Sequence, residues 1–318
     1  MVANRPAGVS EGRYRFGLVP RCICGAAGSR VVRREWELSG GSGVPKINPE
    51  SYLPVESYAE VAQIAHGIWS MLLFEFARQR VADRDVMIRN LIARADKMVS
   101  AVFQLWSIQD YQDCWVLFRC LLERLFHLSC LDEQNEFELF EEWSFLEQYK
   151  AANWARSDPD LGGSTEEGIL GLTPEVRERA DRLLKAPPVW HRPRAKDVAK
   201  RLNLGFLYYY GYDFASRYVH PMADDGSEDF YTTTKLEPTP AFPDHRSVLS
   251  NTLLVMTLIV QKGLNASSLS WHAAIYDFVR DLREFLDCGI ERYKVSFPKI
   301  VHMIEQGMEL SARGVRET

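Results

Sequence analysis

Apolar residues recur every three or four positions along most of the chain after residue 51, which is the period of an amphipathic α-helix. The first such stretch covers residues 54–80, and the second runs from Asp83, which we expect to cap it, to about Trp106. A third stretch, residues 109–131, is apolar almost all round. Because a helix without a polar face is usually buried on every side, this stretch predicts the central helix of the fold.

The helical period continues through the middle of the chain. Asp132 is expected to open a fourth helix, which carries a strongly acidic face. Residues 157–168 are mostly small and polar and predict a loop. Thr173 followed by Pro174 is typical of an N-cap with proline at the first helical position, so a further helix should run from there to about Lys185.

The last third of the chain predicts helices as well. A segment from about Arg194 is expected to enter a helical, tyrosine-rich stretch at 204–220, followed by a loop over 221–243. Two or three long helices should fill residues 244–313. Strand-like alternation, hairpin turns and fixed repeats are missing from the sequence. The pattern therefore predicts an all-α fold, a multi-helix bundle of long antiparallel helices.

The N-terminal region differs from the rest in composition. Residues 1–50 are rich in Gly, Arg and Ser and follow neither a helical nor a strand period, which predicts a disordered tail. Residues 51–318 are expected to form one helical bundle domain, with an insertion at about 155–200.

Composition and charge narrow the class of protein. Apolar residues make up 46% and charged residues 25% of the chain, as in soluble globular proteins. The net charge of −5 gives no overall attraction to nucleic acid or anionic lipid. The longest apolar run, 248–260, is too short to span a bilayer, which predicts a core helix and no membrane association. We find no secretory signal and no C-x-x-C pair among the six cysteines, so we expect reduced thiols and a cytoplasmic protein.

The third helical stretch carries the first candidate for chemistry. Arg119, Glu123 and His127 are spaced four residues apart, so they share one stripe of the helix. Ionisable groups in so apolar a helix need partners, because an isolated buried charge is costly. Two interpretations stay open, a structural ion pair that locks helix packing and a functional pocket.

The second candidate is the stretch YGYDFASRYVHP at 210–221, in which Tyr212, Ser216 and His220 have the same spacing of four. Pro221 disfavours helical geometry at His220, so the helix should end there. The dipole of a helix C-terminus favours a cationic imidazole, which argues against a metal ligand or a neutral base. A hydrogen-bonded anchor or a pair with an acid are the structural alternatives.

Together these residues resemble a known family. R-x-x-x-E on an apolar helix, followed about 90 residues later by Y-x-x-x-S-x-x-x-H-P, is similar to the bacterial helical family called domain of unknown function 5677. The resemblance would cover residues 60–290. It implies that the two stripes face each other across one pocket, and it implies no established activity. The matching positions are Arg119, Glu123, Tyr212, Ser216 and His220.

The arrangement also resembles the HEPN class of helical ribonucleases, small bundles with an arginine and a histidine at a helix end. The spacing departs from that pattern, because two residues separate Arg217 from His220 and seven separate Arg119 from His127. An Arg119–His220 pair assembled in space would still stabilise phosphate charge while the histidine moves a proton. Such a ribonuclease would be independent of metal.

No cofactor or metal is expected. The chain lacks a phosphate-binding loop, a dinucleotide fingerprint, a G-x-S-x-G elbow and the histidine pairs of zinc enzymes. Asp224, Asp225, Glu228 and Asp229 follow His220 closely but lack the order of a calcium-binding loop.

Basic residues cluster between 177 and 201, with four acids interspersed and tyrosines nearby. Basic and aromatic residues together bind single-stranded nucleic acid, so RNA is a candidate partner. A solvated helix face is the ordinary interpretation. The acidic fourth helix, 132–147, is an alternative acceptor for this segment, in the same chain or in a second copy. The cluster comprises Arg177, Arg179, Arg182, Lys185, Arg192, Arg194, Lys196, Lys200 and Arg201.

Two functions follow from these patterns. The first is a helical interaction or regulatory protein, in bacterial stress or phage defence, with a protein partner or a homodimer and with the motif residues as structural locks. The second is a HEPN-like ribonuclease that uses His220 and Arg119. The first is favoured because no complete catalytic signature is present, and whether the protein is an enzyme stays open.

Overall fold

A computed structural model gives the architecture over most of the chain. Among the residues it describes, the protein contains eleven α-helices, one π-helix and one 3-10 helix, and no strand. The all-α class is therefore confirmed, whereas the predicted disorder of residues 1–50 lies outside the described residues. The described residues are 52–78, 82–157, 160, 173–220, 222–224, 226–236, 244–269 and 272–314.

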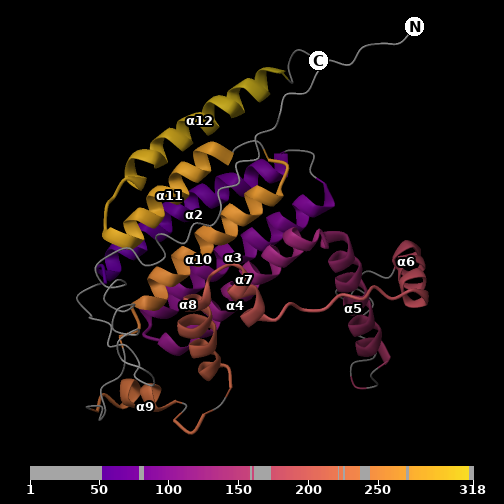
Figure 1. The fold of residues 1–318 in the computed structure, drawn as a ribbon, viewed down its shortest axis with the longest axis horizontal. Coiled ribbons are helices and arrows are strands. Elements are labelled where there is room, and N and C mark those ends of the chain that lie inside the picture. Colours follow the sequence, from indigo (N-terminus) through magenta and orange to yellow (C-terminus); the bar gives the residue numbers. More distant parts are fainter. Residues whose placement is uncertain are drawn as a thin grey trace.

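Six long helices form the body of the molecule and lie side by side (Figure 1). The most extensive contacts join α3, α4 and α10, with α2 beside them and α11 and α12 on the outer side. The antiparallel order of neighbouring helices stays a prediction. These helices are α2 (Val55–Arg78), α3 (Asp83–Ser107), α4 (Tyr111–Gln134), α10 (Ser247–Ala266), α11 (His272–Cys288) and α12 (Tyr293–Gly314).

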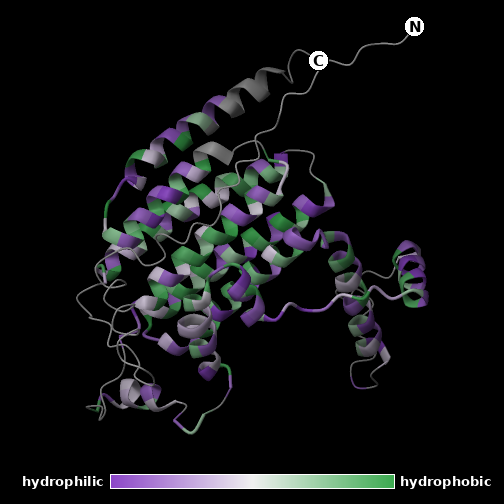
Figure 2. Cartoon of the chain, viewed as in Figure 1, coloured by the Kyte–Doolittle hydropathy of each residue, from purple (hydrophilic) through white to green (hydrophobic). Residues whose placement is uncertain are grey.

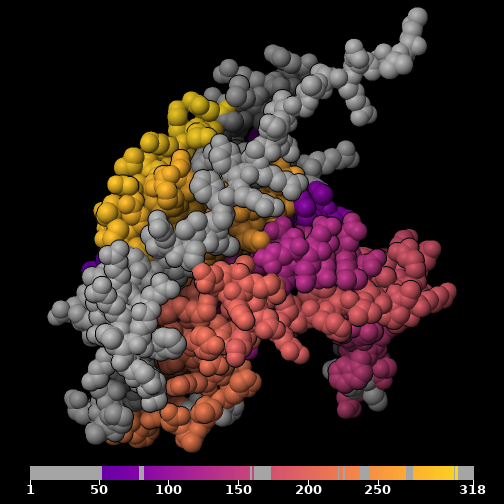
Figure 3. Space-filling model, in the orientation of Figure 1, coloured from indigo at the N-terminus to yellow at the C-terminus, as the bar shows by residue number. Residues whose placement is uncertain are grey.

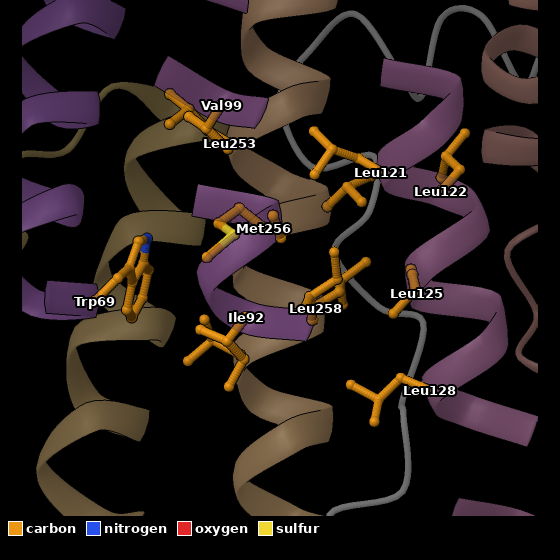
Figure 4. Close-up of a cluster of buried hydrophobic side chains, with 14 of the residues drawn as sticks. Trp69, Ile92, Val99, Leu121, Leu122, Leu125, Leu128, Leu253, Met256 and Leu258 are labelled. Carbon is orange, nitrogen blue, oxygen red and sulfur yellow. The ribbon is translucent and has the colours of Figure 1, made fainter. Parts of the chain in front are cut away.

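The core lies between these helices and is built from aliphatic and aromatic side chains. Leu121, Leu125 and Leu128 of α4 line one side of it, and Met256 and Leu258 of α10 lie beside them (Figure 4). Hydrophobic residues are concentrated on the helices of the body, whereas α6 (Pro174–Lys185) is mainly hydrophilic (Figure 2). Helix α4 thus occupies the central position that its all-round apolar pattern predicts.

Helix α10 is the one described helix that is long and apolar enough to cross a membrane, and 67% of its most apolar window is buried inside the structure.

Two predicted helix starts are wrong by a few residues. Helix α4 continues past Asp132 to Gln134 and ends at Asn135, which adopts left-handed geometry with φ of 54°. Asp132 therefore does not open the next helix, and its carboxylate pairs with Lys262 Nζ on α10 at 2.8 Å. Asp83 is the first residue of α3 rather than its cap, and Ala82 occupies the cap position.

Helices α5 (Phe137–Ser157) and α6 form an arm that projects from the body (Figure 1). Thr173 caps α6 as predicted, because its hydroxyl accepts a hydrogen bond from the Val176 amide at 3.4 Å. Arg179 of α6 forms an ion pair with Glu141 of α5 and lies 4.1 Å from the centre of the Phe145 ring. The acidic helix thus accepts part of the basic segment within the same chain.

The stretch that links the arm to the last helices is less regular than predicted. The expected helix at 204–220 consists of α8 (Gly205–Leu207), a π-helix (Tyr208–Asp213) and a 3-10 turn (Ser216–Tyr218). Before it, residues 186–194 lead into α7 (Ala195–Arg201), which packs on α4. The predicted loop at 221–243 contains a short helix, α9 (Ser227–Thr234).

The close approach of the π-helix to α4 depends on Gly211. A Cβ atom at this position would lie 2.8 Å from Cε1 of Phe118, a buried ring of the core. Because that ring is enclosed, it has no room to retreat. The missing side chain lets the backbone carrying Tyr212 reach the surface of α4.

We therefore expect Gly211→Ala to lower the free energy of unfolding by about 1–3 kcal/mol, the usual cost of overpacking. Gly205→Ala is the matched control, because nothing lies within 4 Å of the Cβ that it would add. It should not lower stability, since alanine favours helix. Chemical denaturation of both variants measures the difference, and equal effects would contradict the proposed close packing.

Candidate functional site

Four of the five motif residues meet at one place, where the segment of residues 205–218 lies on α4. Arg119 and Glu123 are one turn apart on α4, and Arg119 Nη2 lies 3.3 Å from Glu123 Oε1. Arg119 also donates from Nη2 to the Tyr212 hydroxyl at 2.9 Å and from Nε to Ser216 Oγ at 3.1 Å. One guanidinium therefore ties together the two stripes that the sequence predicts to face each other. We call these four residues the Arg119 cluster.

Tyr212 bridges the arginine and the glutamate. Its hydroxyl accepts from Arg119 and donates to Glu123 Oε1 at 3.1 Å. Burial, and then the neighbouring Glu123 carboxylate, raise the pKa of this hydroxyl. The guanidinium carbon of Arg119 also lies 4.5 Å from the centre of the Tyr212 ring, which adds a cation–π contact.

Ser216 is fully engaged within the chain. Its Oγ donates to the Tyr212 carbonyl at 2.8 Å while accepting from Arg119 Nε. No histidine or carboxylate side chain bonds this hydroxyl in the described part of the chain. The geometry fits a positioning role for Ser216 and gives it no general base that would make it a nucleophile.

His220 does not join the cluster. Its side chain is exposed and makes no hydrogen bond or ion pair within the described residues, although its amide donates to the Ser216 carbonyl at 3.2 Å. The predicted stripe assumes an α-helix with about 100° per residue, whereas the 3-10 turn over Ser216–Tyr218 advances about 120°. The helix ends before His220, as expected, and Pro221 lies outside the described residues.

The cluster lies at the edge of the core. The side chains of Arg119 and Glu123 are 18% and 27% exposed, so solvent reaches both charges. The Nη1 group of Arg119 makes no hydrogen bond within the described residues. The arrangement can hold two helical elements together, and it leaves one pair of N–H groups for water or an anion.

His127, the third member of the predicted stripe, faces an aromatic group instead of Arg119. Its ring lies 5.8 Å from that of Trp190 and 6.5 Å from that of Phe140, edge to face in both cases. Burial, with help from Arg192, lowers the pKa of His127 to about 4. Its position in an apolar contact accounts for this preference for the neutral ring.

A second polar group lies deeper and was missed in the sequence. Trp115 Nε1 donates to Nδ1 of His245 at 3.0 Å, and His245 Nε2 contacts the Glu228 carboxylate at 2.9 Å. Because an indole N–H only donates, Nδ1 must accept and the ring proton lies on Nε2, which donates to Glu228. This chain ties α9 to α4. No spacing signal exists for partners 130 residues apart.

The described residues contain no group of three histidines, cysteines or carboxylates that could hold a metal ion. Glu228, one of the acids that follow His220, instead pairs with the ring of His245.

If the cluster locks the segment, Tyr212→Phe should lower the free energy of unfolding by about 1 kcal/mol, because one hydroxyl serves two hydrogen bonds. Arg119→Lys should cost about 1–3 kcal/mol, since one ammonium cannot reach Ser216 and Tyr212 together. The double variant should cost less than the sum of both changes. Tyr209→Phe, at an exposed ring, is the control. Strict additivity in denaturation experiments would contradict a shared network.

The lowered pKa of His127 predicts a pH-dependent stability. Between pH 6.5 and about 4 the unfolded chain binds a proton that the folded chain resists, so stability present above pH 6.5 falls as pH decreases. The full loss is about 3 kcal/mol. His127→Gln should flatten the stability profile in this window, and His191→Gln, at an exposed ring, should not. An unchanged slope in the first variant would exclude His127 as the source.

Comparison with known proteins agrees with the motif. No curated protein and no solved structure matches the chain significantly. The model of a family of unknown function, DUF5677, matches residues 85–233, which include all five motif positions. The resemblance inferred from the motif is therefore confirmed, over a narrower range than the expected 60–290. Residues 85–233 are thus similar to the DUF5677 family of unknown function.

Proposed function

We propose that this protein is a helical interaction protein with a regulatory role, in which the Arg119 cluster is a structural lock. The observation that carries the proposal is that Nε and Nη2 of Arg119 contact three side chains of the same protein, those of Ser216, Tyr212 and Glu123. Hydrogen bonds from a charged guanidinium are stronger than those between neutral groups, so two of them fix the segment firmly on α4. The proposal includes that the protein acts in the bacterial cytoplasm, in a stress response or in defence against phage.

The chain between residues 206 and 236, which begins in the locked segment, carries a large share of the exposed apolar side chains. Six of the fourteen exposed large hydrophobic side chains of the described chain lie between residues 206 and 236. This concentration of exposed apolar side chains along one stretch of the chain supports a contact with another macromolecule. The six are Phe206, Tyr209, Val219, Met222, Phe230 and Leu236.

A ribonuclease that uses His220 and Arg119 is the second candidate. It is favoured by the exposed His220 side chain one turn after Ser216 and by the partly exposed Arg119. It would require Arg119 to leave Tyr212 and Ser216 and to approach His220. No contact joins the His220 side chain to Arg119 in the described structure, so the lock has the stronger support.

The two functions differ in what each substitution does. Under the proposal, purified wild-type protein leaves RNA intact, Arg119→Gln lowers the melting temperature by several degrees, and His220→Ala leaves it unchanged. Gel analysis of a labelled RNA and a thermal melt of each variant give both readouts. Cleavage by the wild type that His220→Ala abolishes, with the fold intact, would replace the lock with the ribonuclease.

A further inference from the structure

The structure divides the predicted basic cluster into two parts. In α6, cations alternate with Glu175, Glu178 and Asp181, and Arg179 is paired with α5. Between residues 191 and 201, five exposed cations share one acid, Asp197. We call the five the basic strip: Arg192, Arg194, Lys196, Lys200 and Arg201.

Most cations of the strip form no ion pair with the residues that the structure describes. Arg201 contacts Glu133 at 3.4 Å and Cys130 Sγ at 2.9 Å. The other four cations form no ion pair within the described residues. Four positive charges with one neighbouring acid, Asp197, leave a net positive strip that attracts an anionic ligand.

The strip is held on a rigid base. Trp190, just before it, is only 6% exposed and packs on Phe140 and Trp143 with ring centres 4.7 Å and 4.8 Å away. Within it, Val198 and Ala199 are buried, and α7 packs on α4. The cations therefore project from an anchored scaffold, which reduces the entropy lost when they bind.

Exposed aromatic rings follow the strip directly. Phe206 and Tyr209 are 36% and 56% exposed, and both lie on the segment that the Arg119 cluster locks. Phe206 packs against Tyr210 with ring centres 4.9 Å apart, which supports its ring at the surface. Helix α7 contacts both α8 and the π-helix, so the elements that carry the cations and the rings are neighbours.

Segments near this part of the chain border a hollow (Figure 3). The space-filling view shows an open notch between the arm of α5 and α6 and the part of the chain near residues 205–236 (Figure 3). Residues 186–194 cross from the arm to the body beside it (Figure 1).

We propose that the basic strip, together with Phe206 and Tyr209, binds single-stranded nucleic acid, with the cations on the phosphates and the rings stacked on bases. This inference rests on the proposed function and names the class of partner. Cations beside solvent-exposed rings match the two chemical features of a single strand, its charged backbone and its uncovered base faces. A duplex is a poorer match because its bases are already stacked on one another. An acidic peptide is a poorer match because it carries no bases that could stack on the rings.

Binding should depend on salt in a defined way, although the whole protein is acidic. With about four phosphate contacts on a single strand, log K should fall with log salt at a slope of roughly −3. The affinity should therefore weaken about 50-fold between 50 and 200 mM salt. Fluorescence anisotropy of full-length protein with a fluorescein-labelled oligouridine of about 20 nucleotides measures this slope.

Substitutions separate the two contributions. Lys196→Gln with Lys200→Gln should reduce the slope by about 1.4. Tyr209→Ala should weaken binding about tenfold without changing the slope, and Tyr209→Phe should bind like the wild type, because stacking needs the ring and not the hydroxyl. The charge control is Arg94→Gln with Lys97→Gln, two exposed cations of α3, which should bind like the wild type.

Several results would overturn the inference. They include failure of the oligouridine to bind at 50 mM salt, and a loss of affinity in the α3 control variant as large as that in the strip variant. A duplex of the same length that binds more tightly, or polyglutamate that displaces the oligouridine completely, would also contradict the inference. Thermal melts of each variant identify any that fail to fold. If Tyr209→Ala is one of them, Phe206→Ala tests stacking at the second exposed ring, with the same expected loss of affinity. Cleavage of the oligonucleotide would refute the proposed function as a structural lock but would not affect the binding result. A failure of the proposed function can therefore be told apart from a failure of the binding inference.

Discussion

A charged guanidinium at the edge of an apolar central helix is the constraint on which the surrounding structure depends. Helix α4 is buried on most sides, so Arg119 cannot simply turn to solvent as a surface arginine would. It must find acceptors nearby, and a half-buried charge without them is costly. Glu123 supplies one from the same helix, while Tyr212 and Ser216 supply two more from a segment more than 90 residues away in sequence. The hydrogen bonds that Arg119 requires thus fix the position of the segment that carries Tyr212 and Ser216.

The segment of residues 205–218 reaches Arg119 as an irregular helix. A regular α-helix over 205–220 would place Tyr212, Ser216 and His220 in one stripe. The observed π-helix and 3-10 turn bring Tyr212 and Ser216 to the same guanidinium and turn His220 away to solvent. Gly211 permits the approach, because any side chain there would meet the Phe118 ring. π-helices are rare and occur mostly as single turns. Here Tyr212 of the π-helix is held on α4 by its hydrogen bonds with Arg119 and Glu123.

These details show which features the sequence can predict. Local signals were sufficient where neighbours in the chain make the contact: the Thr173 cap, the Arg119–Glu123 pair and the central position of α4 were all predicted. The convergence of Tyr212 and Ser216 on Arg119 came from family resemblance and not from spacing. The π-helix was missed because its contacts with Arg119 and Phe118 join residues more than 90 positions apart in sequence. His245 was missed for the same reason, since Trp115 and Glu228 identify its role only after folding.

The distribution of charge links the lock to the proposed partner. An acidic protein of net charge −5 repels a polyanion at long range, so any such binding must come from cations close together and held in place. The basic strip meets this condition because α7 is packed on α4 and Trp190 is buried beside it. The rings that would stack on bases lie on the segment that Arg119 holds, so loosening Arg119 would release the rings and leave the strip in place. A variant of Arg119 should therefore lose stacking before it loses the electrostatic part of binding, which separates the lock from the surface that it supports.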